Sequence, residues 1–180
     1  FKSLVHLFRN AVDHGVEAPD TRIMNGKQEV AEIKCYIKTV DLNNFKIVIE
    51  DDGSGVDISK VIEMAISNGV MTSDEALDMT SDHVLELIFT QGVTTKETTN
   101  LISGRGVGLA AVKSQVIRLG GQIKLSSEPN KGSKFLITLP IIQGADIIVV
   151  EPTSFMDRVE ASAKQYFTAL GLTLGDGVVE

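Results

Sequence analysis

The sequence has one cysteine and no long apolar run, and each shortage excludes a class of protein. Cys35 cannot form an internal disulfide, and structural disulfides are typical of secreted chains. No stretch approaches the roughly 20 consecutive apolar residues that a membrane-spanning helix needs, and no secretory signal peptide is recognisable. We therefore expect a cytoplasmic protein with no direct membrane insertion. Because the chain begins at Phe1 inside a helical pattern, we also expect its N-terminal part to be truncated.

Positively charged residues are also fewer than negatively charged ones. The 180 residues include 17 Lys and Arg against 24 Asp and Glu, which gives a formal net charge of −7 and a pI near 5.0. Nucleic acid or an anionic membrane as the main partner would require a basic face, so the composition argues against both. With 43% hydrophobic residues, the chain can bury the core of one domain and carry an appendage.

The beginning of the chain is predicted to form a helix, over residues 1–15, with two contrasting faces. The residues that recur at helical spacing and are expected to face a core are Phe1, Leu4, Val5, Phe8, Ala11 and Val12. The residues expected on the polar face are His6, Arg9, Asn10 and Asp13, with His14 one turn beyond Asn10. Lys and Glu are stronger helix formers than His, Asn and Asp, so we interpret this face as a binding site rather than an ordinary solvated surface.

Asn10 is the informative residue of that polar face. Its side-chain oxygen is a neutral, hard ligand of the kind that Mg²⁺ accepts beside phosphate oxygens and water. The guanidinium of Arg9, one residue earlier, could bind the same phosphates. The first helix therefore predicts half of a phosphate site.

Two alternating segments, 33–37 and 45–49, predict antiparallel strands. Strand alternation then places Asp51 on the apolar face that carries Ile47 and Ile49. A carboxylate buried there without a partner would cost several kcal/mol, and an exocyclic amino group such as that of adenine could donate the missing hydrogen bond. The alternative is that Asp51 caps the turn that follows it.

The segment after Asp51 continues the pattern of a ligand site. Gly53 and Gly55 allow a sharp turn and a close approach of the backbone to a flat ligand. Asp57 is predicted to cap a helix that runs to about Asn68, with Lys60 in its first turn.

A polar segment at 90–103 is predicted to be a mobile flap. It leads into the glycine-rich sequence GRGVG at 104–108, and an apolar helix begins at Leu109. Free N–H groups at such a helix N-terminus attract phosphate. The sequence is not a P-loop, because no Gly-Lys-Ser/Thr follows. It is not a dinucleotide fingerprint either, because Leu109 takes the last glycine position and no strand leads in.

Three motifs in this order resemble the ATP-binding domain shared by histidine kinases, gyrase, MutL and the heat-shock chaperone ATPases (the GHKL or HATPase family). They are His6-x-x-x-Asn10, the DDGSG box at 51–55 and the glycine box at 103–109. The resemblance covers about residues 1–142. It implies an α+β fold, a two-layer α/β (Bergerat) sandwich with a mixed sheet and helices on one face, which binds ATP and Mg²⁺ between the first helix and a lid.

Within this family, residues 7–17 and 103–108 are most similar to the CheA group of chemotaxis histidine kinases. On matching positions the resemblance implies that Asn10 binds Mg²⁺ and that Asp51 binds the adenine amino group. The residues expected near the phosphates are His6, Arg9, His14, Lys60 and Lys96. The other nucleotide-binding positions are Asp13, Gly53, Gly55, Gly104, Arg105, Gly106, Val107, Gly108 and Leu109.

The reaction expected is γ-phosphoryl transfer from ATP to a histidine on another domain. Hydrolysing relatives carry a glutamate where His6 stands, and that carboxylate activates water; its absence here favours transfer to a better nucleophile than water. The acceptor is expected elsewhere, because His6 and His14 belong to the site and His83 lacks the combination of acidic and arginine neighbours expected of a phosphorylated histidine helix. A regulatory module that binds nucleotide without turnover and a hydrolase like gyrase or MutL remain alternatives.

The resemblance also implies partners: a histidine phosphoacceptor domain, a response regulator and a receptor or adaptor, in a dimeric full-length protein. Residues 143–180 are expected to form a strand–helix extension, with a buried strand at 147–150 and a helix from Pro152. Two interpretations stay open. The extension is the start of a receiver-like or regulatory domain, or it packs on the sheet of the ATP-binding domain.

Overall fold

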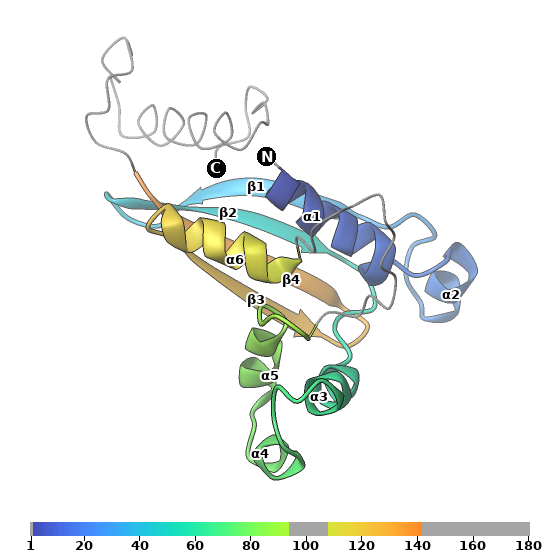
Figure 1. The fold of residues 1–180 in the computed structure, drawn as a ribbon. Coiled ribbons are helices and arrows are strands. Elements are labelled where there is room, and N and C mark those ends of the chain that lie inside the picture. The colour runs from blue at the N-terminus through green and yellow to red at the C-terminus, as the bar shows by residue number, and fades with distance from the viewer. Residues whose placement is uncertain (1, 94–107, 142–180) are drawn as a thin grey trace.

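A computed structural model describes residues 2–93 and 108–141 (Figure 1). Its elements in chain order are α1 (Lys2–Asn10), the π-helix η1 (Ala11–Gly15), α2 (Pro19–Met24), β1 (Ile33–Thr39), β2 (Asn44–Asp51), α3 (Ile58–Ser67), α4 (Ser73–Leu77), α5 (Ser81–Leu87), α6 (Leu109–Arg118), β3 (Gln122–Glu128) and β4 (Gly132–Pro140). Over these two ranges, no helix is both long enough and apolar enough to cross a membrane.

The four strands form one sheet in the order β1-β2-β4-β3. Ile47 on β2 pairs with Ile37 on β1 and with Ile137 on β4, so the centre of the sheet is a row of isoleucines. All three pairings are antiparallel, whereas the sequence analysis expected a mixed sheet. Short turns join β1 to β2 and β3 to β4, and short turns can join only antiparallel neighbours.

Helices cover one face of this sheet, which gives the expected two-layer α+β architecture. Figure 1 shows α1 and α6 lying side by side across the strands, and the two helices contact each other. The main core lies between the layers. Its most buried members are Leu7, Ile37, Phe45, Ile47, Ile49, Val112, Ile137 and Leu139.

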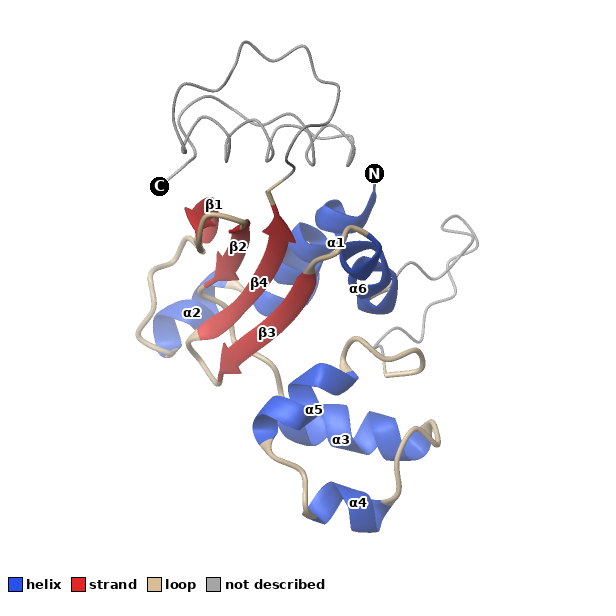
Figure 2. Cartoon of the chain, turned by 90° about the vertical axis from the view of Figure 1, so that its left-hand side faces the viewer, coloured by secondary structure: helices blue, strands red, loops and turns tan. Residues whose placement is uncertain are grey.

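A second, smaller core lies among the short helices. Figure 2 shows α3, α4 and α5 grouped beyond the end of the sheet, and the buried residues of this cluster are Val61, Ala65, Met71, Val84 and Val93. The predicted cap at Asp57 is confirmed. Asp57 accepts a hydrogen bond from the backbone N–H of Lys60, and Thr72 forms a capping box with Glu75.

The segment between the first helix and β1 contains a helix that the sequence analysis missed. No helix was predicted between the first helix at 1–15 and the strand at 33–37, but Pro19–Met24 is helical and has Pro19 in its first turn. Proline is favoured there because its nitrogen needs no hydrogen-bond acceptor and its φ angle is already helical. With six residues, α2 is too short to show a periodic pattern.

The buried stripe of the first helix also differs from the expected one. Leu7, which the predicted stripe omitted, is fully buried, whereas Val5 and Val12 are 44% and 59% exposed. Ala11 is buried as expected. From Ala11 onward the helix is a π-helix, in which the N–H of Val16 donates to the carbonyl of Ala11 at 2.8 Å. The wider turn no longer follows α-helical spacing, so the pattern fails at Val12.

We predict that Leu7→Ala lowers the free energy of unfolding by about 2–5 kcal/mol, because it leaves a cavity between α1 and the sheet. Val12→Ala should change it by less than about 0.5 kcal/mol, as is usual for an exposed site. Urea denaturation of the two variants measures both values. A larger loss for Val12→Ala than for Leu7→Ala would contradict the orientation of α1 described here.

Candidate functional site

The end of η1 lies directly against the loop that follows β2. The backbone N–H of Ser54 donates to the carbonyl of Gly15 at 2.7 Å. A Cβ on Gly53 would overlap that carbonyl oxygen, and a Cβ on Gly15 would lie 3.1 Å from Oδ1 of Asp51. Glycine at both positions therefore lets the first helix and the end of β2 form one continuous wall.

Asp51 is the last residue of β2 and is half-buried. Its Oδ1 accepts a hydrogen bond from the N–H of Gly53 at 3.0 Å, so the capping role considered in the sequence analysis is present. Burial raises the pKa of this carboxyl group, although hydrogen bonds from the backbone of Gly53 and Ser133 act in the opposite direction. A carboxylate has about four acceptor positions, so Asp51 can still accept a bond from a ligand.

The predicted polar residues of the first helix lie on α1 and η1. His6 and Asn10 are half-buried, whereas Arg9, Asp13 and His14 are exposed. Asp13 and His14 belong to the π-helical turn, and single π-turns occur frequently at functional sites. The segment that carries all five side chains ends at the contact with the Asp51 loop.

The remaining predicted site residues are more dispersed. Lys60 is exposed in the first turn of α3. Gly55 has φ +75°, and a Cβ there would overlap the carbonyl oxygen of Glu128, so this glycine is required by the β3–β4 turn. Gly108 is the N-cap of α6, and Leu109 is buried in the core. The predicted site residues that lie outside the described ranges are Lys96, Gly104, Arg105, Gly106 and Val107.

A group of charged residues beside the Asp51 loop was missed by the sequence analysis. Arg22 on α2 is 1% exposed, and in the described part of the chain it is the only buried charged residue. Its NH2 group donates to Oδ2 of Asp52 at 2.7 Å and its NH1 group to Glu17 at 3.3 Å. Lys27 also donates to Glu17, at 2.7 Å. Because these residues follow no periodic pattern, no sequence signal marked them.

The two carboxylates of this charged group are held in their ionised forms. Burial opposes the ionisation of Asp52 and Glu17. The hydrogen bonds to each carboxylate and the positive charges of Arg22 and Lys27 together outweigh that effect, so both pKa values lie below their ordinary range. The four charges cancel within the group, and such pairing is the usual condition for burying a charge like that of Arg22.

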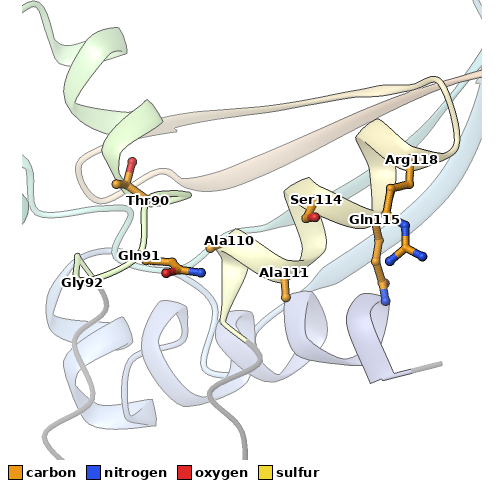
Figure 3. A pocket seen from close by; sticks show the side chains of 8 residues that line it. All are labelled: Thr90, Gln91, Gly92, Ala110, Ala111, Ser114, Gln115 and Arg118. Carbon is orange, nitrogen blue, oxygen red and sulfur yellow. The ribbon is translucent and has the colours of Figure 1, made fainter.

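The described part of the chain has two hollows near the predicted site residues. One, of about 540 Å³, is at the Asp51 end of the sheet and is lined by residues from the ends of all four strands, among them Ser127 and Ser133. The other, of about 400 Å³, lies between residues 90–92 and the outer side of α6 (Figure 3). Asn10 lines neither hollow, so it is the Gly15 contact that relates Asn10 to Asp51.

Comparisons with known proteins agree with the motifs. Residues 2–143 match the family model described as histidine kinase-, DNA gyrase B-, and HSP90-like ATPase. The chain is 43% identical over 140 residues to the chemotaxis protein CheA of Bacillus subtilis, covering 77% of this chain and 20% of that protein. It is 41% identical over 138 residues to a gliding motility regulatory protein of Myxococcus xanthus, covering 77% of this chain and 18% of that protein.

Among solved structures, the histidine kinase domain of a blue-light activated kinase from Erythrobacter litoralis matches with a TM-score of 0.39 and 12% identity, over 75% of this chain and 40% of that chain. The chain spans about a fifth of the length of the curated relatives. The family model covers most of the chain, from residue 2 to residue 143. The chain therefore belongs to the family of histidine kinase-, DNA gyrase B- and HSP90-like ATPases.

Proposed function

We propose that residues 1–142 form the ATP-binding catalytic domain of a CheA-like histidine kinase, which transfers the γ-phosphoryl group of ATP to a histidine on another domain. The observation that carries the proposal is the 2.7 Å hydrogen bond from Ser54 to Gly15. It joins the helix that bears Asn10 to the strand that ends in Asp51. A triphosphate bound along the helix would thus have its base near the acid.

In this proposal Asp51 recognises the adenine base. Its Oδ1 is oriented by the N–H of Gly53, and the remaining acceptor positions of the carboxylate would take the exocyclic amino group. The half-buried position strengthens such a bond, because competing water is reduced. A base without a donor at this place would leave the carboxylate without its partner.

Asn10 is proposed to hold Mg²⁺ together with the phosphate oxygens. Over residues 2–93 and 108–141, no cluster of three or more His, Cys, Asp and Glu could bind a metal by itself. This fits Mg²⁺, which commonly binds to one or two protein oxygens, substrate phosphates and water. When bound, the ion would neutralise charge on the phosphates. Arg9, His14, Lys60 and Lys96 are proposed to assist by binding the same oxygens.

His6 is proposed to favour transfer over hydrolysis. It occupies the position at which hydrolysing relatives carry a glutamate, so the carboxylate that activates water in those relatives is missing at this position. The acceptor histidine, the response regulator and any receptor or adaptor then belong to other domains or proteins. The strand–helix extension predicted at 143–180 lies outside the described residues, and both interpretations of it stay predictions.

We predict that Asp51→Asn weakens ATP binding by about 10- to 100-fold, because an uncharged amide replaces a charge-assisted acceptor. If the N–H of Gly53 still donates to the side-chain oxygen of the asparagine, its NH₂ group faces the amino group of the base, and two donors then oppose each other. Calorimetric titration with ATP and Mg²⁺ measures the dissociation constant. Asp78→Asn, at an exposed residue after α4, is the matched control and should bind like the parent chain. Equal binding by both variants would refute the role of Asp51.

Asn10→Ala should abolish most of the gain in ATP affinity that Mg²⁺ provides. Titrations with Mg²⁺ and with EDTA give that gain as a ratio of dissociation constants, and the affinity in EDTA should change little. His83→Ala, at an exposed position on α5, should retain the full gain. A variant at Asn10 that responds to Mg²⁺ like the parent would show that another group holds the ion.

The three candidate activities differ in their products. With γ-labelled ATP, the full-length protein should form an acid-labile phosphohistidine, while the 180-residue chain alone should release little phosphate. Steady phosphate release by the chain would favour a hydrolase instead. ATP binding with neither product would favour a regulatory module without turnover.

A further inference from the structure

We propose that Arg22 and Lys27 are positioning residues for base recognition: they hold the Asp52–Gly53 peptide so that its N–H points at Asp51. The inference rests on the proposed role of Asp51 as the base-reading acid. It assigns a purpose to the charged group formed by Glu17, Arg22, Lys27 and Asp52, which the proposed function does not otherwise use.

Arg22 binds both the backbone carbonyl and the side chain of Asp52. Its NH1 group donates to the carbonyl oxygen of Asp52 at 3.3 Å and its NH2 group to the side chain of Asp52 at 2.7 Å. Its Nε donates to the carbonyl of Gln28 at 2.8 Å, which fixes the guanidinium plane. A planar guanidinium with this many partners holds its acceptors in one orientation.

Lys27 binds the same carbonyl of Asp52 and also the next carbonyl along the loop, that of Gly53. Its Nζ donates to the carbonyl oxygens of Asp52 and Gly53 at 2.9 and 2.6 Å, and to Glu17 at 2.7 Å. These three acceptors use all three hydrogens of an ammonium group. The Lys27 side chain is 13% exposed, so water competes little for these bonds.

The planar trans peptide carries this restraint to Asp51. In such a unit the C=O and the N–H point in opposite directions. The carbonyl of Asp52 is fixed by the two cations, so the N–H of Gly53 must point the other way, and there it donates to Oδ1 of Asp51 at 3.0 Å. The next peptide repeats the arrangement, since Lys27 holds the carbonyl of Gly53 while Ser54 donates to Gly15.

A positioning role and a purely structural role of Arg22 and Lys27 predict different effects on nucleotide binding. Asp51 acts only on the exocyclic amino group of the base, so a misplaced Asp51 should affect only nucleotides that carry that group. A general loss of structure would weaken the binding of every nucleotide. The informative quantity is therefore the ratio of two affinities measured on the same variant.

The experiment uses the 180-residue chain, with folding checked by circular dichroism, and titrates it with ATP and with purine riboside triphosphate, which lacks the amino group. The parent should prefer ATP by about tenfold or more, as expected for a bond to a charged acceptor. Lys27→Met should reduce this preference to about twofold or less. Lys27→Arg, which keeps the charge and the donors, should restore most of the preference.

Lys124→Met is the matched control, because it removes the same charge from an exposed position on β3 and should keep the preference of the parent. If Lys27→Met does not fold, Lys27→Gln takes its place. An unchanged preference in the Lys27 variant would overturn the inference while leaving the proposed function intact. A parent chain that binds ATP without any preference, or does not bind it, would instead refute the proposed role of Asp51.

Discussion

The close approach of two backbones, at Gly15 and Gly53, is the constraint on which the rest of the site depends. The carbonyl at the end of η1 accepts a hydrogen bond from the loop after β2, and a side chain at Gly53 would occupy the place of that carbonyl oxygen. The first helix carries the amide of Asn10, and β2 ends in the acid Asp51. Without this contact the two would be separate features of the surface.

The loop that begins at Asp52 is restrained from three directions, which makes it a rigid half of the site. The helix end holds Ser54, and the cations on and after α2 hold the carbonyls of Asp52 and Gly53. From the third side, the N–H of Asn130 donates to the carbonyl of Ser54 at 2.7 Å, and the N–H of Val56 donates to Ser127 Oγ at 2.8 Å. A recognition group held in place before the ligand arrives loses less entropy on binding.

Local patterns of the sequence predicted the elements whose causes are local. The alternation around Ile47 predicted β2, and Asp57 predicted the start of α3, because a cap and its partner lie within three residues. Asp51 was singled out correctly as a half-buried acid, since strand alternation alone assigns its face. The π-turn of η1 was not predictable in this way, because it depends on where the helix end meets a distant loop.

Long-range contacts explain what the sequence could not reveal at the site itself. Arg22 lies 30 residues before Asp52, and in sequence it looks like a surface charge on a polar connection. Arg22 is buried and Glu17 and Lys27 are nearly so, and charges in such positions are costly unless they are paired. Their pairing depends on a geometry that only the fold creates. That dependence favours a role in holding the peptide beside Asp51, because general stability could come more cheaply from apolar packing. In the proposed site, the acid that reads the base is thus held in place by residues that do not themselves contact the base.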